Sequence, residues 1–344
     1  MSLAIVALLA TWSPHAFAHD LTVAGRGEAT QAAIAAAYLH PFSEATRIEG
    51  ESVTWDGGLD ALRERLKAPD NSWDVILVDA GELAAACAEG LLEKLDWSAI
   101  GGKDHYQPQA VSDCGLGAAN STVVLAWDRD KLPMALSWGD FWDVAKYPGK
   151  RGLAGTVRGA MEIALLADGV APGDVYKTLA STEGQDRAFQ KLDQLRPYIV
   201  WWHTEADAAR ILGSGDVLMT SAPSGIIATT ARRQSRNFGI QWAASLTELS
   251  SWAIAKGSPH LRNAQQFLYF TGMPAMQTRF MRQTGQAGMA KGLNDGLPPE
   301  LQAISPTFAA NSAGSIRVDA AFWHDNEMKL RQRFEAWLGP APKP

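Results

Sequence analysis

The chain has few cysteines, no long apolar stretch beyond its first residues, and no excess of basic charge. Its 344 residues include two cysteines, 31 Lys and Arg, and 37 Asp and Glu, which give a formal net charge of −6. After residue 18 no apolar run reaches the roughly 20 residues that span a bilayer as a helix, so we expect no membrane insertion of the chain that follows. The acidic balance gives no reason to expect nucleic acid as a partner.

Motifs of catalysis and metal binding are also missing. Gly25 and Gly27 begin like a dinucleotide fingerprint, but Thr30 stands where the third glycine belongs. There is no P-loop and no HExxH, and Ser224 lacks the leading glycine of a nucleophile elbow. Neither the cysteines nor the seven histidines share metal-ligand spacing. We therefore expect no cofactor, no metal and no enzyme, with an exported enzyme as the alternative.

The first residues predict export. Residues 3–9 form an apolar run, and residues 15–18 (HAFA) carry the small-x-small pattern of a signal-peptidase site. We expect a signal peptide over 1–18 and a mature, periplasmic chain that begins at His19. In that oxidising compartment Cys87 and Cys114 favour a disulfide, and two buried thiols are the alternative.

Strands and helices alternate along the mature chain, which predicts βαβ units, an α/β fold and mostly parallel sheets. A composition change over residues 133–149 marks a crossing into a second lobe, and later strands return to the first. We predict lobe 1 from 19–126 and 248–344 and lobe 2 from 127–247, with crossover strands as the hinge. The predicted strands are 21–25, 53–55, 73–78, 121–127, 152–155, 199–202, 217–220, 239–242 and 251–254, and the predicted helices are 30–42, 59–67, 80–89, 159–166, 187–195, 205–212, 261–272, 275–284 and 325–338.

This alternation predicts where a ligand binds. In open parallel sheets ligands lie beyond the carboxyl ends of strands, at the N-termini of the following helices. Six strand-to-helix turns would line one cleft between the lobes, and the alternative for each is that its polar groups only cap a helix. The turns are 25–29, 55–58, 79–81, 156–159, 203–205 and 221–225.

Several segments resemble periplasmic solute-binding proteins of the spermidine/putrescine-type ABC importer family. They are 87–96 (CAEGLLEKLD), 111–115 (VSDCG), 161–170 (MEIALLADGV), 200–202 (VWW), 211–216 (ILGSGD) and 334–338 (FEAWL). The resemblance implies a two-lobed type II periplasmic-binding-protein fold that delivers a solute to an ABC permease in the inner membrane. It also implies a Cys87–Cys114 disulfide. We expect a monomer, because the hinge and the permease-facing surfaces must stay free.

The ligand positions depart from the polyamine pattern of that family. Glu248 and Ser250 stand where the family has an acid and a tryptophan, and Ser221 replaces an aromatic residue. Thr156 and Gly159 replace two acids. A polyamine needs aromatic faces and paired carboxylates, so the cage for spermidine or putrescine looks lost.

Two arginines favour a different solute. Arg26 and Arg158, each in a cleft turn, would bind a carboxylate or phosphonate. Carboxylates would hold an ammonium group, and a tryptophan would cover the apolar middle, as for an amino acid derivative, an opine or an aminophosphonate. The alternatives are a genuine spermidine/putrescine binder and an Arg26 that pairs internally with Glu28 or Asp79. The full candidate set is Arg26, Glu28, Trp55, Asp56, Asp79, Thr156, Arg158, Trp202, His203, Thr204, Ser221, Ser224, Glu248 and Ser250.

Two further expectations concern the tryptophans and the tyrosines. Trp201 and Trp202 alternate along a strand, so only one of them can face the cleft. Ferric ion, which favours paired phenolates, is not expected as the solute, since the six tyrosines include no adjacent pair.

Overall fold

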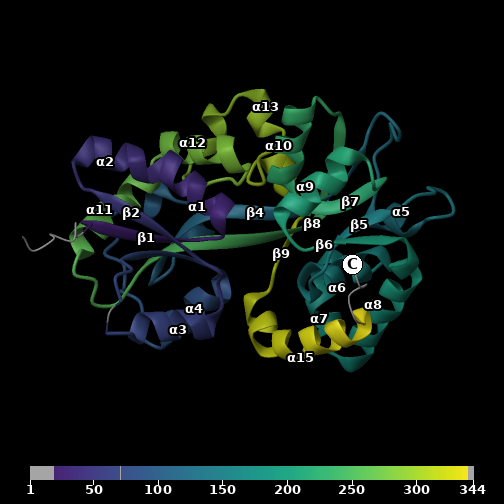
Figure 1. Ribbon diagram of the computed structural model, residues 1–344, viewed down its shortest axis with the longest axis horizontal. Helices are drawn as coiled ribbons and strands as arrows, with labels where there is room; N and C mark the ends of the chain where they lie inside the picture. The colour runs from purple at the N-terminus through teal and green to yellow at the C-terminus, as the bar shows by residue number, and fades with distance from the viewer. Residues whose placement is uncertain (1–18, 70, 340–344) are drawn as a thin grey trace, which may run out of the picture.

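The computed structural model describes residues 19–69 and 71–339, and the predicted signal peptide lies outside them. One nine-stranded mixed sheet runs through two lobes in the order β2-β1-β3-β8-β4-β7-β5-β6, with β9 paired to β8. The two long central strands, β4 (Gly115–Asp128) and β8 (Phe238–Ile254), cross from one lobe to the other (Figure 1). The predicted two-lobed α/β fold is therefore confirmed.

The first lobe is built on three short parallel strands. Its β3 is buried at all four positions, which suits a strand covered on both faces. The elements of this lobe are β1 (Leu21–Arg26), α1 (Glu28–Ile34), a π-helical turn (Ala35–Leu39), α2 (His40–Thr46), β2 (Gly50–Trp55), α3 (Leu59–Lys67), β3 (Val75–Val78), α4 (Ala80–Ala88), α11 (Leu261–Thr271) and α12 (Pro274–Thr284).

The second lobe repeats the parallel pattern, with β5 paired to both β6 and β7. Its elements are α5 (Trp138–Trp142), β5 (Arg151–Ala154), α6 (Val157–Ala167), α7 (Val175–Leu179), α8 (Thr182–Leu195), β6 (Ile199–Trp202), α9 (Glu205–Ser214), β7 (Met219–Pro223) and α10 (Ser224–Gln234). The chain then continues through α13 (Pro299–Gln302), α14 (Ala309–Ser312), β9 (Ile316–Arg317) and α15 (Ala320–Leu338). Single 3₁₀ turns lie at Lys103–His105, Pro108–Ala110, Pro172–Asp174, Arg196–Tyr198 and Leu293–Gly296.

The hinge region is antiparallel, so the sheet is mixed rather than mostly parallel. β8 pairs antiparallel with β3 and with β4, and β4 pairs antiparallel with β7. The two returning strands predicted at 239–242 and 251–254 are one continuous strand of 17 residues. The prediction missed the middle because residues 243–250 (AASLTELS) mix small, polar and apolar side chains without a compact apolar pattern. Residues 246–250 pair with β4, and a bulge interrupts that pairing over residues 242–245.

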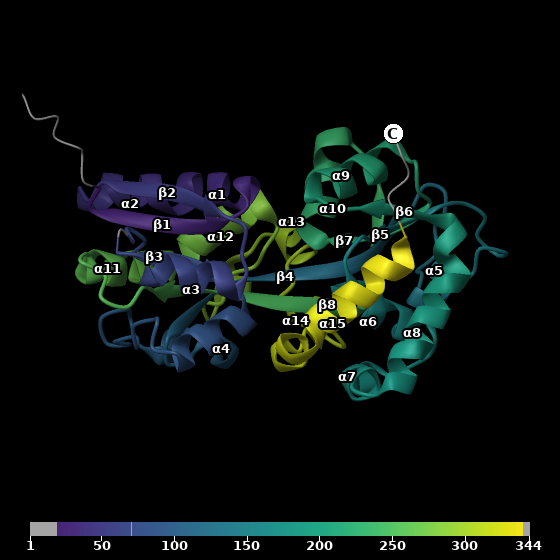
Figure 2. The same cartoon turned by 60° about the horizontal axis from the view of Figure 1, so that its bottom comes forward.

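Two separate cores underlie the lobes. In the first, Tyr38, Phe42 and Trp252 are buried with Phe267, and in the second, Phe141 and its neighbours surround α6. α15 buries Trp323, Leu330 and Phe334 in the second core, and it lies across α6 and α8 in Figure 2. The predicted limits of the lobes stay a prediction. The prediction assigned the whole range 248–344 to lobe 1, whereas α15 packs with the second lobe.

A disulfide joins Cys87, at the end of α4, to Cys114, immediately before β4. The disulfide that the sequence and its resemblance predicted is confirmed. Within residues 19–69 and 71–339 no helix combines the length and the apolar character needed to cross a bilayer. Over the same residues no group of three or more His, Cys, Asp or Glu side chains is placed to hold a metal ion.

Candidate functional site

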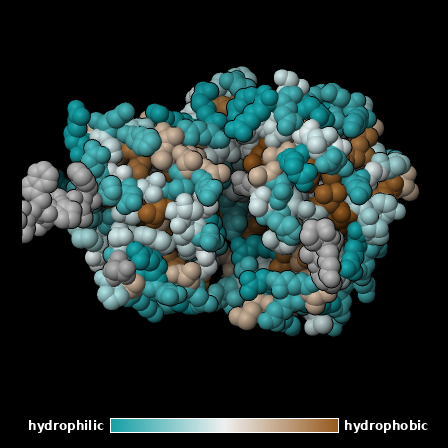
Figure 3. Space-filling view, viewed as in Figure 1, coloured by the Kyte–Doolittle hydropathy of each residue, from teal (hydrophilic) through white to brown (hydrophobic). Residues whose placement is uncertain are grey.

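A cavity of about 460 Å³ lies between the lobes. It sits at the carboxyl ends of β1, β3, β5 and β6, where parallel sheets bind ligands. Figure 3 shows the surface hollowed between the two lobes, with hydrophilic side chains inside the hollow. We call this the cleft cavity. It is lined by Arg26, Gly58, Leu59, Asp79, Gly81, Glu82, Ser121, Val123, Ala154, Thr156, Arg158, Gly159, Ile163, Trp202, Ser221, Leu246, Glu248, Val318, Ala320, His324 and Glu327.

The first-lobe wall is organised by a capping box at the start of α4. Asp79 Oδ1 accepts from the Glu82 N–H at 2.8 Å, and Glu82 Oε2 accepts from the Asp79 N–H at 2.9 Å. Glu82 also accepts from the Gly58 N–H, at 2.6 Å, and pairs with the Arg26 guanidinium. One buried carboxylate therefore fixes the starts of α3 and α4 and the end of β1 around the same point.

Arg26 points into the cleft from the end of β1. Its guanidinium has Asp79 at 3.6 Å and lies 5.2 Å from the centre of the Trp55 ring. The internal pairing of Arg26 with Asp79, one of the alternatives from the sequence, is present, and Glu82 adds a second partner. A solute carboxylate at Arg26 would have to compete with both.

The second-lobe wall depends on a kink at the start of α6. Arg158 has extended backbone angles and Gly159 has φ 89°, a left-handed conformation that favours glycine. The Gly159 N–H donates to Glu162 Oε2 at 2.8 Å, while Glu162 Oε1 accepts from the Tyr176 hydroxyl at 2.9 Å and the Trp323 indole at 2.8 Å. Burial raises the pKa of Glu162, although these hydrogen bonds oppose the shift. Glu162 thus ties the kink to α7 and α15.

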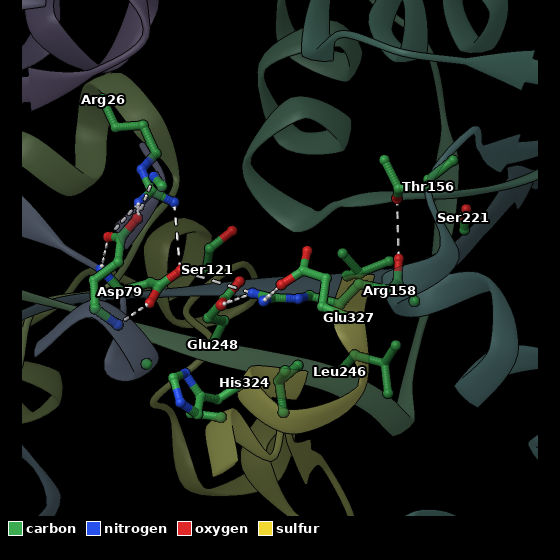
Figure 4. A pocket seen from close by; sticks show the side chains of 18 of the residues that line it. Arg26, Asp79, Ser121, Thr156, Arg158, Ser221, Leu246, Glu248, His324 and Glu327 are labelled. Atoms are coloured by element: carbon green, nitrogen blue, oxygen red, sulfur yellow. Dashed lines mark hydrogen bonds and ion pairs between the residues drawn. The ribbon is translucent and has the colours of Figure 1, made fainter. Parts of the chain in front are cut away.

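The kink sends the Arg158 side chain across the cavity (Figure 4). Its guanidinium lies 2.9 Å from Glu248, 2.8 Å from Glu327 and 3.8 Å from Asp79. Burial alone would lower the pKa of Arg158, but these carboxylates raise it above its usual value. Because Asp79 belongs to the first lobe, the pair with Arg158 is a contact between the lobes.

Acidic groups outnumber basic groups in the cleft cavity. Its lining includes four carboxylates, from Asp79, Glu82, Glu248 and Glu327, against the guanidinium groups of Arg26 and Arg158. Burial raises the pKa of Glu248. The Arg158 guanidinium opposes this shift, whereas the Asp79 and Glu82 carboxylates raise the pKa further. The carboxylates of the cavity can therefore pair with a further positive charge, and its arginines can donate hydrogen bonds to a negative group.

Two donors in the cavity are buried without a partner in the part of the chain that the structure describes. They are the Ser221 hydroxyl and Arg158 Nε. Trp202 donates its indole N–H to the Ser221 carbonyl at 3.0 Å, which leaves its ring as an apolar surface of the cavity. Trp201 instead packs edge-on against Phe334 and Trp337, so Trp202 is the tryptophan of this pair that lines the cleft.

The structure brings half of the predicted candidates into the cleft cavity. These are Arg26, Asp79, Thr156, Arg158, Trp202, Ser221 and Glu248. The lining does not include the other seven, which are Glu28, Trp55, Asp56, His203, Thr204, Ser224 and Ser250.

Several of the seven residues outside the lining pack in the fold or cap a helix. Trp55 is buried behind Arg26 and packs on Trp73, with ring centres 5.8 Å apart. Thr204 caps α9 by accepting from the Asp207 N–H, and Ser224 is buried at the start of α10. Glu28 and Asp56 are exposed.

The two remaining candidates also lie away from the lining. The His203 ring covers Gly155, and Ser250 is paired with Ala119 inside the sheet. Any role of these seven residues in solute binding stays a prediction.

Sequence reasoning missed several lining residues. Glu82 follows Asp79 by three residues, and this capping-box spacing could have identified it. His324 and Glu327 come from α15, which reaches the cleft only because it packs on the second lobe. No local pattern in the sequence indicates that placement.

These features define a class of protein: two lobes joined by crossing strands, with a polar cavity between them. The chain matches the bacterial extracellular solute-binding protein family over residues 37–311 and belongs to that family. The sequence-based resemblance to solute-binding proteins of ABC importers is confirmed.

The relatives agree on the kind of protein. The chain is 40% identical over 319 residues to the gamma-aminobutyric acid-binding protein of Pseudomonas aeruginosa, covering 92% of this chain and 90% of that protein. It is 27% identical, with a TM-score of 0.83, to a GABA receptor structure, Atu4243, covering 94% of this chain and 99% of that one. The glucopine complex of the periplasmic binding protein MotA from A. tumefaciens is 27% identical, with a TM-score of 0.79, and the match covers 93% and 99%.

The chain is therefore the solute-binding component of an ABC importer and not an enzyme. Proteins of this class bind small polar solutes outside the cytoplasm and deliver them to permease subunits.

Proposed function

We propose that the protein binds a zwitterionic ω-amino acid, with γ-aminobutyric acid (GABA) as the first candidate, in the periplasm and delivers it to its permease. The observation that carries this proposal is the opposed chemistry of one cavity. Arg158 crosses the cavity, and the Ser221 hydroxyl in its lining has no partner within residues 19–69 and 71–339, while four carboxylates line the cavity as well. The first set suits a carboxylate and the second an ammonium group.

The charge balance separates a zwitterion from a simple anion. A solute with only a carboxylate would enter a cavity in which acidic groups already outnumber basic ones. An ammonium group among Asp79, Glu248 and Glu327 offsets that excess, so both ends of the solute contribute to binding. The names of the relatives support this reading, because two of them are described as binding GABA and a third is bound to glucopine.

The proposed mechanism is closure of the lobes around the solute. Asp79 and Arg26 belong to the first lobe and Arg158 and Ser221 to the second, so a bound zwitterion would contact both. Its stronger contacts in the closed arrangement shift the population toward closure without any chemical step. We also propose that the protein acts as a monomer, which size-exclusion chromatography with light scattering would test.

The test is a calorimetric titration of the protein, residue 19 onward, with GABA and three matched compounds. Butyrate lacks the ammonium group, butylamine lacks the carboxylate, and putrescine carries two ammonium groups. We expect a Kd for GABA of about 1 μM or lower, near −8 kcal/mol, and binding of both monopolar compounds weaker by at least about a hundredfold. Arg158→Gln should abolish GABA binding, whereas Arg262→Gln, an exposed arginine of α11, should not.

A polyamine binder is the second candidate, and the excess of carboxylates in the cleft cavity favours it. Putrescine binding tighter than GABA would overturn the zwitterion proposal and support this candidate. Equal binding of GABA and butylamine would show that neither arginine recognises a carboxylate, and it would overturn the proposal as well.

A further inference from the structure

A second cavity, of about 710 Å³, lies behind the cleft and beside the disulfide. It is bounded by α4, by residues 109–114, by β8, and by the connection from β9 into α15. We call it the disulfide cavity. Glu248, Val318 and Ala320 line both cavities, so they form the wall between them.

The disulfide cavity has an apolar floor and a basic rim. Leu83, Ala110, Leu249 and the Cys87–Cys114 disulfide supply apolar surface. Two exposed cationic side chains, Lys94 and Arg317, belong to its lining, and neither has an ion pair or side-chain hydrogen bond within residues 19–69 and 71–339. Asp113 is the acidic residue of this lining besides Glu248, which is paired with Arg158.

The two cavities therefore favour opposite charges. Carboxylates outnumber cations in the cleft cavity. At the disulfide cavity, the charged residues without an ion pair among the described residues are two cations, Lys94 and Arg317, and one acid, Asp113. Its volume is in the range of small-molecule sites, and an apolar floor with a few charged groups is their usual chemistry.

We propose that the disulfide cavity is a second binding site, which takes an organic anion with an apolar body. The carboxylate of this anion pairs with Arg317 and Lys94, and the apolar body covers Leu83 and the disulfide. The site is distinct from the cleft cavity, although Glu248, Val318 and Ala320 line both.

The position of the site also connects it to the arrangement of the lobes. α4 packs with the first lobe, while Arg317 and Val318 lead into α15, which is buried in the second core. An anion in the disulfide cavity touches both, and so it stabilises one arrangement of the lobes over others. Any resulting coupling to the cleft solute is reciprocal between the two ligands.

The probes are 4-phenylbutyrate and octanoate, with 4-phenylbutyramide as a neutral match for the first. The two acids distinguish an aromatic from an alkyl body, and the amide isolates the charge. By calorimetry we expect one of the acids to bind stoichiometrically and the amide to bind about tenfold more weakly. Saturating GABA should leave probe binding in place.

Three variants locate the site. Arg317→Gln should weaken probe binding by about fivefold or more, and the control Arg262→Gln should leave it unchanged. Ala84→Trp, on α4 at the cavity, should fill the space and abolish probe binding while GABA binding persists.

Three outcomes would overturn the proposal: no binding of either acid, equal binding of acid and amide, or displacement of the probe by GABA in a competitive manner. Because probe and GABA are measured separately, a failure of GABA to bind would count against the proposed function and leave the test of this site intact.

Discussion

At the residue scale, the chemistry of the cleft depends on carboxylates that position other groups. Glu82 is the clearest case, since it holds Arg26 and the starts of two helices in the first lobe. Glu162 has the corresponding place in the second lobe, where it accepts three hydrogen bonds from three different elements. Each holds in place an arginine or a backbone segment of the cleft wall, and through that group it would act on a solute in the proposed site.

Glu162→Gln should weaken both the fold and solute binding. The amide nitrogen replaces one acceptor, so a donor now faces the Gly159 N–H or the Tyr176 and Trp323 donors, at a cost of about 1–3 kcal/mol. We expect a lower unfolding free energy and a Kd raised by about tenfold or more, because the kink that aims Arg158 loses its anchor. Tyr176→Phe is the control, since it removes one hydrogen bond and keeps the contact to Gly159. Equal Kd values for the two variants would contradict a positioning role.

Glu248→Gln should change how stability depends on pH. The pKa of Glu248 is raised in the folded protein, so the folded chain keeps this proton to a higher pH than the unfolded chain does. The unfolded state then binds fewer protons between the usual Glu pKa and the raised value, and stability falls as pH rises through that window. The variant should show a shallower fall in denaturant midpoints as the pH rises above the usual Glu pKa of about 4.3. Glu162, whose pKa is raised in the same direction, contributes to the slope that remains. Glu300→Gln, at an exposed site, should follow the wild type, and a parallel profile for Glu248→Gln would contradict the assignment.

At the element scale, the sequence predicted most helices and strands of the lobes and missed what tertiary packing decides. Ile199–Trp202 and Leu59–Lys67 were predicted with their observed limits, because each is a compact pattern between turn residues. The strand β8 was predicted as two pieces, since its central residues mix small, polar and apolar side chains and lack a compact apolar pattern. The site was predicted where it follows from strand ends, as at Arg26 and Asp79, and missed where a distant helix supplies it, as at Glu327.

The kink at the start of α6 provides a test of backbone conformation. Gly159 has φ 89°, and the nearest atom to an added Cβ, in Leu246, is 3.9 Å away, so space is not the constraint. Gly159→Ala should cost about 1–2 kcal/mol of unfolding free energy through strain and should also weaken solute binding. Gly169, with φ 85° and open space around it, is a matched control outside the cleft cavity. Gly169→Ala should lose similar stability and keep its Kd. Loss of binding in both variants would contradict a local role for the kink.

The disulfide stabilises the first lobe at the junction of α4 and β4. Its cysteines are 27 residues apart, and closing a loop of that length corresponds to about 3.5 kcal/mol in the chain-entropy estimate. The double variant Cys87→Ser, Cys114→Ser should lower the unfolding free energy by about that amount in denaturant titrations. The wild type in reducing buffer should match it. A loss below about 1 kcal/mol would show that the unfolded chain gains little freedom from the missing bond.

At the scale of the whole molecule, the lobes touch at several places outside the crossing strands, and α15 of the second lobe packs against α4 of the first. Besides the pair of Arg158 with Asp79, Gly225 at the start of α10 meets Thr284 and Gly285 at the end of α12. A Cβ on Gly225 would lie 1.9 Å from the Thr284 carbonyl oxygen, so this contact between lobes allows no side chain.

Gly225→Ala should therefore alter the arrangement of the lobes. The hinge lets the lobes separate at this point, so we expect a changed small-angle scattering profile of the ligand-free protein and a changed Kd. Gly184→Ala is the matched control, because its Cβ would meet the Thr178 carbonyl at the same 1.9 Å but inside one lobe. That variant should lose stability without a change in scattering. An unchanged profile for Gly225→Ala would show that α10 shifts within its own lobe instead.

The place of α15 in the chain has a consequence for biogenesis. This helix is the last of the described elements, and it brings His324 and Glu327 to the cleft while filling the second core with Trp323, Leu330 and Phe334. Synthesis proceeds from the N-terminus, so Asp79 and Glu248 are made before Glu327, the third carboxylate that pairs with Arg158. The cleft cavity therefore gains its last wall only when α15 has docked on the second core.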